Sequence, residues 1–274
     1  MKCLLSLVTI GCLVALAVAF PTEDLKLPAY GGKEYLKQQG DLLKILKYLH
    51  QPYWNAELYK YGTQYHIWED YDSYDNVEKV KVFVDFYKHK RLLAKNAVFS
   101  LYNVEHLEQT KVIFDALFHA KTYDTMWKFA AWLRFNINEK MLIYLAALVI
   151  AHKPGFDYHN MPPPYEVCPY QFINAEAIKL AHRYKMQGFY GVELVDGVKE
   201  VIIPVNYTGW YMHMNPDQKV SYFTEDVGLN AFYYNFNIDY PHWMEGKPYG
   251  LDLDRRGEFY IIMHHEIYAR FVLK

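Results

Sequence analysis

Hydrophobic residues recur at helical spacing along most of this chain. Leu42, Ile45, Leu46 and Leu49 share one face of a helix that ends before Gln51-Pro52. Asn138 is a favourable N-cap for a helix that continues to Ala151. The same spacing, with polar starts and basic ends, predicts further helices over residues 80–91, 105–119, 122–135, 175–185, 225–239 and 258–273.

Proline and glycine interrupt this helical pattern near the middle of the chain. Lys153-Pro154-Gly155 and Pro162-Pro163-Pro164 break the periodicity and predict a domain boundary between residues 153 and 165. Two apolar runs, residues 192–195 and 201–203, flank Asp196-Gly197, which favours a β-hairpin. The predicted fold class is therefore mainly α. We expect an all-helical domain over residues 20–153 and a second helical domain with a small β-hairpin over residues 154–274.

The first 19 residues have the pattern of a secretory signal peptide. Met1 and Lys2 precede an apolar stretch that closes on Ala17-Val18-Ala19, a small-x-small cleavage site. The alternative, an uncleaved anchor, needs a longer apolar segment and a following cluster of charges. The longest later apolar run, residues 141–151, is also too short to span a membrane and predicts a buried helix. We expect secretion and no membrane insertion.

Charge and cysteine content narrow the classes of protein. Lys and Arg number 29 and Asp and Glu 31, with no separate basic block, which gives no support to nucleic-acid binding. Cys3 and Cys12 lie in the predicted signal peptide, so an intramolecular disulfide at Cys168 is excluded once that peptide is cleaved. A buried, unreactive thiol is the expected state of Cys168, and a disulfide between subunits is the alternative.

Aromatic residues are unusually abundant, with 27 Tyr, 16 Phe and 6 Trp making up 18% of the chain. One interpretation is a large core with extensive subunit contacts, because aromatic side chains bury large areas. The other is selection for the composition itself, as in a protein that is degraded to supply tyrosine and phenylalanine. The segment Tyr71-Asp72-Ser73-Tyr74 is expected to be a loop in which core packing explains little. The residues alone leave both interpretations open.

No complete catalytic site is present in the sequence. His264-His265-Glu266 begins a metalloprotease-like pattern, but Ala269 stands where the second histidine is needed. Nucleophile elbows, phosphate-binding loops and dinucleotide fingerprints are also missing from the sequence. We therefore predict no enzyme activity, no catalytic residues, no bound metal and no cofactor. Asn206-Tyr207-Thr208 is an N-glycosylation acceptor, and Asn206 is expected to be glycosylated in a secreted chain.

Several motifs, in the same order, resemble the arthropod hemocyanin superfamily over nearly all of the chain after the signal peptide. The proline-rich motif and the Asp-Arg-Arg-Gly-Glu motif are the most specific. The matching stretches are Ala120-Lys121-Thr122-Tyr123-Asp124-Thr125, Ala130-Ala131-Trp132, Asn138-Glu139-Lys140-Met141, Pro162-Pro163-Pro164-Tyr165-Glu166-Val167-Cys168-Pro169-Tyr170, Glu225-Asp226-Val227-Gly228-Leu229-Asn230 and Asp254-Arg255-Arg256-Gly257-Glu258.

This resemblance implies a helical N-terminal domain, a helical middle domain with two copper sites, an immunoglobulin-like β-sandwich and assembly into hexamers. The chain would then stop inside the middle domain, as a fragment or a short product. The oxygen-carrying and phenol-oxidising members hold the first copper with a histidine pair at i and i+4 and a third histidine on the next helix. The pair aligns with Tyr233 and Asn237 here, and only His264 matches the third ligand. One imidazole cannot make that copper site.

A member of this superfamily without copper ligands resembles the hexamerins, the insect haemolymph storage proteins, and the aromatic excess points to the arylphorins. The resemblance implies a secreted nutrient reservoir of aromatic amino acids, assembled as a hexamer with identical or related subunits, and it allows for an uptake receptor. A carrier of small apolar ligands, such as a juvenile hormone, is the alternative, and an oxygen carrier or phenoloxidase is less favoured.

The apolar residues Tyr260, Ile261, Ile267 and Phe271 predict aggregation or an oligomer-dependent state.

Overall fold

The computed structural model describes residues 32–156, 159–173, 175–189, 194–195, 197–203 and 219–273. The predicted signal peptide, residues 1–19, and the predicted glycosylation site Asn206 lie outside the described residues. By its backbone contacts the chain divides into Met1–Gln38 and Gln39–Lys274. The described part of the first unit is the start of a helix, and the arrangement described below concerns the second unit.

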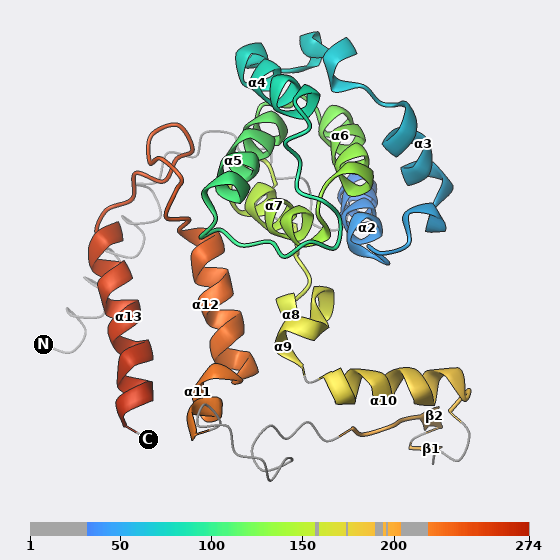
Figure 1. Cartoon of the computed structure of the whole chain (residues 1–274), viewed down its shortest axis with the longest axis vertical. Coiled ribbons are helices and arrows are strands. Elements are labelled where there is room, and N and C mark those ends of the chain that lie inside the picture. Colours follow the sequence, from blue (N-terminus) through green and yellow to red (C-terminus); the bar gives the residue numbers. More distant parts are fainter. Residues whose placement is uncertain are drawn as a thin grey trace, which may run out of the picture. The chain divides into compact units, whose positions relative to one another are not determined.

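The described residues are mainly helical, which confirms the predicted fold class (Figure 1). The first long helices are α2 (Lys33–Leu46), α3 (Ala56–Gln64), α4 (Val77–Lys88), α5 (Val104–Phe118), α6 (Tyr123–Asn136) and α7 (Glu139–His152). Three 3-10 helices lie among them: η1 (Pro52–Trp54), η2 (Ile67–Glu69) and η3 (Tyr71–Ser73). Then follow α8 (Pro164–Val167), α9 (Pro169–Phe172), α10 (Ala175–Met186), β1 (Leu194–Val195), β2 (Val198–Lys199), α11 (Ser221–Thr224), α12 (Val227–Asp239) and α13 (Arg256–Val272).

The long helices were predicted to within a few residues, but two local features differ from the prediction. The predictions did not include α3, although Asn55 caps it by accepting hydrogen bonds from the backbone N–H groups of Glu57 and Leu58. The hairpin is present, but its second strand is Val198–Lys199 and not residues 201–203. Val195 pairs with Val198 across a two-residue turn that contains Gly197 at φ +78°. A turn this short fixes the register next to the turn itself, which is why the second strand starts earlier than its apolar residues suggested.

Asparagine side chains start most of the helices in the first half of the chain. Asn76, Asn103 and Asn138 each accept a hydrogen bond from a backbone N–H group in the first turn of α4, α5 and α7. These acceptors satisfy donors that a helix leaves unpaired at its N-terminus. Asn138 in addition donates from Nδ2 to the carbonyl oxygens of Ala94 and Ala97, at 3.0 and 2.9 Å. The predicted N-cap at Asn138 is therefore confirmed, and this residue also fixes the loop that precedes α5.

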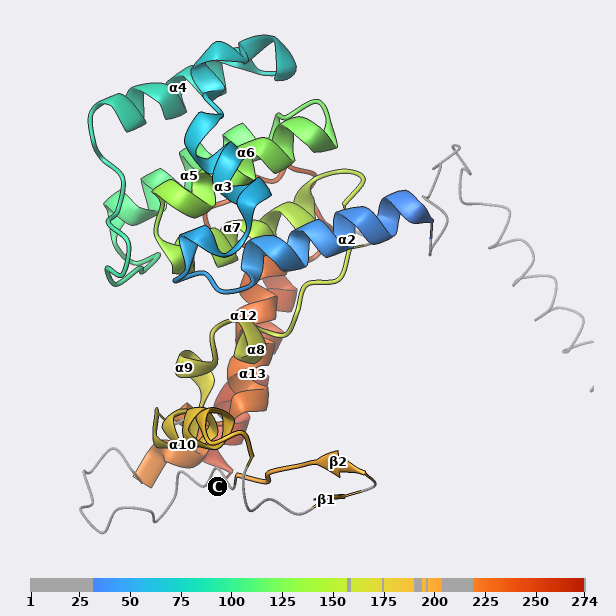
Figure 2. The ribbon, with the colours of Figure 1, turned by 90° about the vertical axis from the view of Figure 1, so that its right-hand side faces the viewer.

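The core is built around α7, the helix with the longest apolar run. Its residues Met141, Leu145 and Leu148 are fully buried, as are side chains on more than one of its faces. Helices α5, α6 and α12 pack against it. From top to bottom of Figures 1 and 2, α4, α5, α7 and α12 succeed one another. The prediction of a buried helix here is confirmed, and the described helices are all too short or too polar to cross a bilayer.

Aromatic side chains make up much of this core, and one prediction about them was wrong. Residues 71–73 form η3 and not a loop, and Tyr71 packs against the core. Tyr74 is only 1% exposed, and its hydroxyl lies 3.0 Å from that of Tyr65. Burial raises the pKa of both phenols well above the ordinary value, because ionisation would leave a charge in an apolar environment. Core packing therefore does account for this tyrosine pair.

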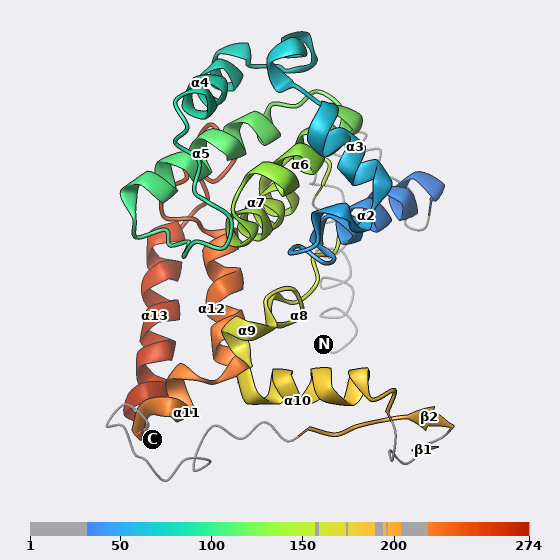
Figure 3. The ribbon, with the colours of Figure 1, turned by 45° about the vertical axis from the view of Figure 1, so that its right-hand side comes forward.

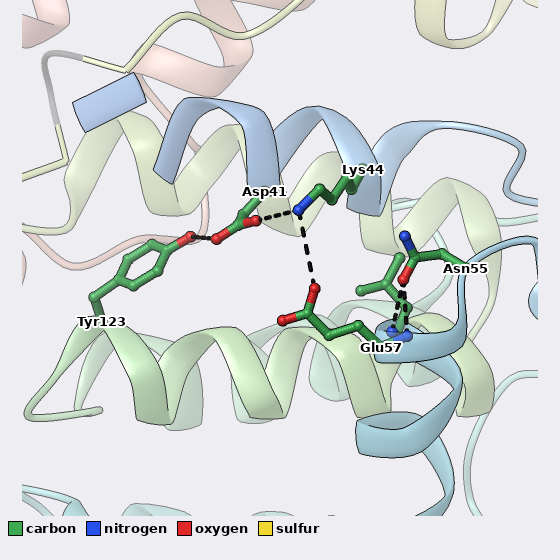
Figure 4. Close-up of polar contacts among 6 residues, drawn as sticks. Asp41, Lys44, Asn55, Glu57 and Tyr123 are labelled. Carbon is green, nitrogen blue, oxygen red and sulfur yellow. Dashed lines mark hydrogen bonds and ion pairs between the residues drawn. The ribbon is translucent and has the colours of Figure 1, made fainter. Parts of the chain in front are cut away.

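A polar cluster fixes the second half of α2 to α3 and α6 (Figure 4). The buried carboxylate of Asp41 accepts hydrogen bonds from Lys44 Nζ at 2.9 Å and from the Tyr123 hydroxyl at 3.1 Å. Lys44 Nζ also lies 3.9 Å from a carboxylate oxygen of Glu57 on α3. Asp41 thus has a cation and a neutral donor as partners, which offsets the cost of burying its charge.

Two buried cations pair with backbone carbonyls. Arg134, 1% exposed, donates to the carbonyl oxygens of Ile45, Tyr48 and Gln51 at the end of α2, and burial lowers its pKa to about 10. Lys153 donates to the carbonyl oxygens of Phe118 and Ala120 at the end of α5, and burial lowers its pKa to about 8. Carbonyls at a helix C-terminus carry partial negative charge, so they are suitable partners for a buried cation.

Candidate functional site

Two long helices, α12 and α13, carry the three positions that the sequence relates to a copper site. Figures 1 and 3 show α12 and α13 side by side along most of their length. Asp226 starts α12 by accepting a hydrogen bond from the backbone N–H of Leu229 at 2.8 Å, and it also binds Arg270 of α13. Arg255, with φ +57°, precedes α13. The N-terminal end of α12 is thus joined to the C-terminal turn of α13.

Aromatic rings fill the contact between these two helices. The ring of Phe236 on α12 lies 5.7 Å from Phe259, 6.4 Å from Tyr260 and 6.4 Å from His264. The ring of Tyr233, one turn earlier, meets His264 edge to face at 6.1 Å. Near the C-terminal end of α13, Phe223 of α11 meets Phe271 at 5.3 Å. The residues that face each other across this pair of helices are therefore mostly aromatic.

The structure places Tyr233 and Asn237 one turn apart on α12 and brings the ring of Tyr233 into contact with His264 of α13. Asn237 Nδ2 donates to the Tyr233 carbonyl oxygen at 2.7 Å, a bond within α12. His264 Nδ1 lies 2.8 Å from the Tyr260 carbonyl oxygen. A carbonyl can only accept, so Nδ1 carries the proton and Nε2 is the nitrogen left for other contacts.

These side chains do not fit a copper ion. The resemblance implies a copper site of three imidazoles, and among the three aligned positions only His264 supplies one. Tyr233 could ligate only as a phenolate, but burial raises its pKa, which disfavours that form. Among residues 32–273 that the structure describes, no group of three His, Cys, Asp or Glu side chains could hold a metal ion. The arrangement supports packing between helices and not metal chemistry.

A cavity of about 590 Å³ lies beside these positions. Residues from α7, α8, α9, α12, α13 and the segment 99–102 line it. Seven of the sixteen lining residues are aromatic: Phe99, Tyr102, Tyr144, Phe172, Tyr233, Tyr234 and Tyr260. Cys168 also lines it and is buried, as expected from the sequence. A mostly apolar pocket with a few polar groups is typical of sites for small organic ligands.

Two tyrosines in the cavity wall were not identified from the sequence. The hydroxyl of Tyr144 accepts a hydrogen bond from Trp243 Nε1 at 3.1 Å, so its own proton remains available to a ligand. The hydroxyl of Tyr234 is buried with no hydrogen-bond partner among the described residues, and burial raises its pKa. Periodicity places both residues on helices, but it does not show that α7 and α12 meet beside a cavity.

Polar contacts join α7 and the segment around α12. His152 Nε2 donates to the Ile238 carbonyl oxygen at 2.7 Å, which ties the ends of α7 and α12. Tyr249 binds the carboxylate of Asp115 on α5, which also accepts from Lys79 Nζ at 2.8 Å. Arg256 NH2 donates to the Pro241 carbonyl oxygen at 2.8 Å. These contacts hold the candidate site against the helices that precede it.

Comparison with known families gives the class of this protein. Residues 35–158 match the family described as "hemocyanin, all-alpha domain", and residues 163–274 match "hemocyanin, copper containing domain". Together the two matches extend over most of the chain. The chain therefore belongs to the hemocyanin family, in agreement with the motifs found in the sequence.

Within this family the chain is similar to insect hexamerins and arylphorins. It is 33% identical over 267 residues to hexamerin 70b of Apis mellifera, a match that covers 96% of this chain and 38% of the relative. It is also 33% identical to a hexamerin of Blaberus discoidalis, over 97% of this chain and 35% of the relative. The identity to arylphorin subunit beta of Manduca sexta is 32%, over 86% of this chain and 35% of the relative. The chain spans little more than a third of the length of these curated relatives.

Proposed function

We propose that this chain is part of an extracellular storage protein of insect haemolymph, a hexamerin that serves as a reservoir of aromatic amino acids. One observation carries this proposal: Tyr233 and Asn237 stand at two of the three positions that the resemblance to hemocyanins aligns with copper-binding histidines. The aromatic content of 18% and the similarity to hexamerins and arylphorins support it. The function then consists of assembly, storage and later proteolysis, without enzymatic turnover.

Further parts of this proposal concern processing and assembly. Residues 1–19 act as a cleaved signal peptide, and Asn206 carries an N-linked glycan. Residues 20–153 form the hemocyanin-type N-terminal domain, and residues 154–274 belong to the middle domain, a division that the limits of the two family matches support. Tyr233, Asn237 and His264 are the remnant of the first copper site. The protein assembles as a hexamer with identical or related subunits and is taken up through a receptor.

Metal analysis of the natural protein tests the storage proposal. The protein is purified from haemolymph, and its copper content and its oxidation of a catechol are measured beside a copper-loaded hemocyanin as the positive control. We expect copper well below one ion per chain and no catechol oxidation. Stoichiometric copper, or oxidation that a copper chelator abolishes, would show that the protein is an oxygen carrier or a phenoloxidase.

The cavity beside Tyr233 favours a second candidate function, the transport of small apolar ligands such as a juvenile hormone. Its volume of about 590 Å³ and its aromatic walls suit a ligand of this class. Saturable binding of the labelled hormone to the purified protein, weakened by Tyr144→Trp, would support transport. Binding no stronger than to an unrelated serum protein, or equal binding to the Tyr144→Trp variant, would remove this candidate.

A further inference from the structure

Two exposed tyrosines form a ring pair on the surface, away from the cavity and from the copper-related positions. Tyr53 lies on η1 and is 76% exposed, whereas Tyr59 lies on α3 and is 42% exposed. Their ring centroids are 5.2 Å apart, with an angle of 46° between the ring planes. Two phenols thus lie in contact at a place that a macromolecular oxidant in solution can reach.

The fold holds this pair in position through a third ring. Phe135 of α6 meets Tyr59 at 5.7 Å and Tyr53 at 6.5 Å, both edge to face. Phe135 lies so close to α3 that a Cβ on Gly62 would be 2.1 Å from its Cδ2 atom. The glycine therefore lets Phe135 pack beneath the two tyrosines. Lys95 Nζ lies 5.9 Å from the ring centroid of Phe135 and donates to the neighbouring Arg134 carbonyl oxygen, which restrains the ring from the other side.

We propose that Tyr53 and Tyr59 are an oxidative cross-linking site, at which a peroxidase and hydrogen peroxide join the two rings as dityrosine within one chain. Each phenol loses one electron and its hydroxyl proton to give a phenoxyl radical. The unpaired electron of each radical is shared with the ring carbons ortho to oxygen, and two of these carbons form the new C–C bond. The proton on each of these carbons then moves to the phenol oxygen. In total the two tyrosines lose two electrons and two protons, which reduce one hydrogen peroxide to two waters.

Proximity decides which tyrosines react. A phenoxyl radical on Tyr53 has Tyr59 as its neighbour, whereas coupling to another molecule requires a diffusive encounter. Exposed side chains such as Tyr53 change rotamer within picoseconds to nanoseconds, so the small rotation that brings the ortho carbons together is not limiting. The hydroxyl groups of Tyr65 and Tyr74 lie 3.0 Å apart, but Tyr74 is 1% exposed, so a peroxidase cannot reach it. Tyr48 is 49% exposed, but its ring neighbour at 5.6 Å is Trp54.

The test oxidises the whole chain at low protein concentration with horseradish peroxidase and limiting hydrogen peroxide. Dityrosine fluorescence is measured, and the cross-linked peptides are located by mass spectrometry. We expect a peptide pair that contains Tyr53 and Tyr59 and is lighter by two hydrogens. Tyr53→Phe and Tyr59→Phe should each abolish this product, because phenylalanine keeps the ring but forms no phenoxyl radical. Tyr48→Phe is the matched control and should leave the yield unchanged, and circular dichroism checks that all variants fold.

Three results would overturn the proposal. In the first, the dityrosine forms between other tyrosines and persists in both variants. In the second, Tyr53 couples only to another molecule, which gives covalent dimers on a denaturing gel. In the third, folded protein forms no dityrosine while a short tyrosine peptide in the same reaction does.

Discussion

Single residues decide how charge is accommodated in this core. Arg134 and Lys153 are both buried, and the partners that they bind are backbone carbonyls at helix ends. Such partners carry only partial charge, so they do not fully compensate for the loss of hydration. The pKa of each side chain is therefore lowered, because burial disfavours its charged form. The two cations therefore link helices. Because the pKa of Lys153 is about 8, its contribution to the unfolding free energy depends on pH in mildly alkaline solution.

Lys153 should make the free energy of unfolding rise with pH in mildly alkaline solution. Its pKa is about 8 in the folded protein and 10.5 ordinarily, so between these values the unfolded chain binds more protons. The unfolding free energy then increases with pH by about 1–3 kcal/mol over this window. Urea unfolding of the wild type and of Lys153→Met at several pH values measures the effect. The difference in unfolding free energy between the wild type and Lys153→Met should change between these two pH values. Parallel pH profiles of the two proteins would contradict the prediction.

Gly62→Ala should destabilise the protein by about 1–3 kcal/mol, because the added methyl group overpacks the contact with Phe135. A Cβ at this position would lie 2.1 Å from Phe135 Cδ2, which is shorter than any allowed van der Waals distance between two carbon atoms. Gly40 is the matched control, since it also lies in a helix but has nothing within 4 Å of the position of a Cβ. Gly40→Ala should stabilise by up to about 1 kcal/mol. Thermal unfolding of both variants gives the comparison, and equal effects would show that Phe135 moves away freely.

At the scale of elements, capping and periodicity explain most helices, and their contacts explain the differences between them. The caps Asn103 and Asn138 are chemically alike. Asn103 makes its capping bonds at the exposed start of α5. Asn138 is buried and also holds two carbonyl groups of the loop before α5. The same residue type thus has a local role in one helix and a tertiary role in the other.

Asn138→Ala should therefore cost more stability than Asn103→Ala. Loss of an exposed cap costs about 1 kcal/mol. Loss of Asn138 leaves the carbonyl oxygens of Ala94 and Ala97 without this donor and should cost about 2–4 kcal/mol in total. Chemical denaturation of the two variants measures both values. Equal losses would mean that water replaces the Asn138 amide without penalty.

At the scale of the whole molecule, the most distinctive surface is the apolar face of α13. Ile261, Ile262 and Tyr268 are exposed there, whereas Phe259 and Tyr260, which are about half exposed, also contact Phe236 of α12. Of the four residues expected to lack partners, Ile261 is exposed and Ile267 is partly buried. Tyr260 and Phe271 are partly exposed, but their rings contact Phe236 and Phe223. A continuous apolar surface of this kind is typical of a contact with another protein surface.

The chain should therefore self-associate through α13. Ile262→Glu and Tyr268→Glu place charge on the exposed face and should shift the protein toward the monomer in sedimentation velocity. Val82→Glu is the control, because Val82 is also exposed but lies on α4, which has no residue in the cavity beside α13. The prediction fails if the wild type sediments as a single monomeric species and melts cooperatively.

The sequence by itself determined the features that depend on neighbouring residues. The long helices followed from apolar spacing, with Asn138 as a cap, and the resemblance of the motifs to hemocyanins aligned Tyr233 and Asn237 with copper-binding histidines. Other features required contacts between distant segments. The hydroxyl of buried Tyr74 finds its partner on Tyr65, and the cavity forms where α7 and α12 meet beside residues 99–102. Tyr53 and Tyr59 both pack on Phe135, which Gly62 admits. Periodicity does not predict such contacts, because it describes the apolar face of a single helix or strand. Only the tertiary structure shows which faces pack together.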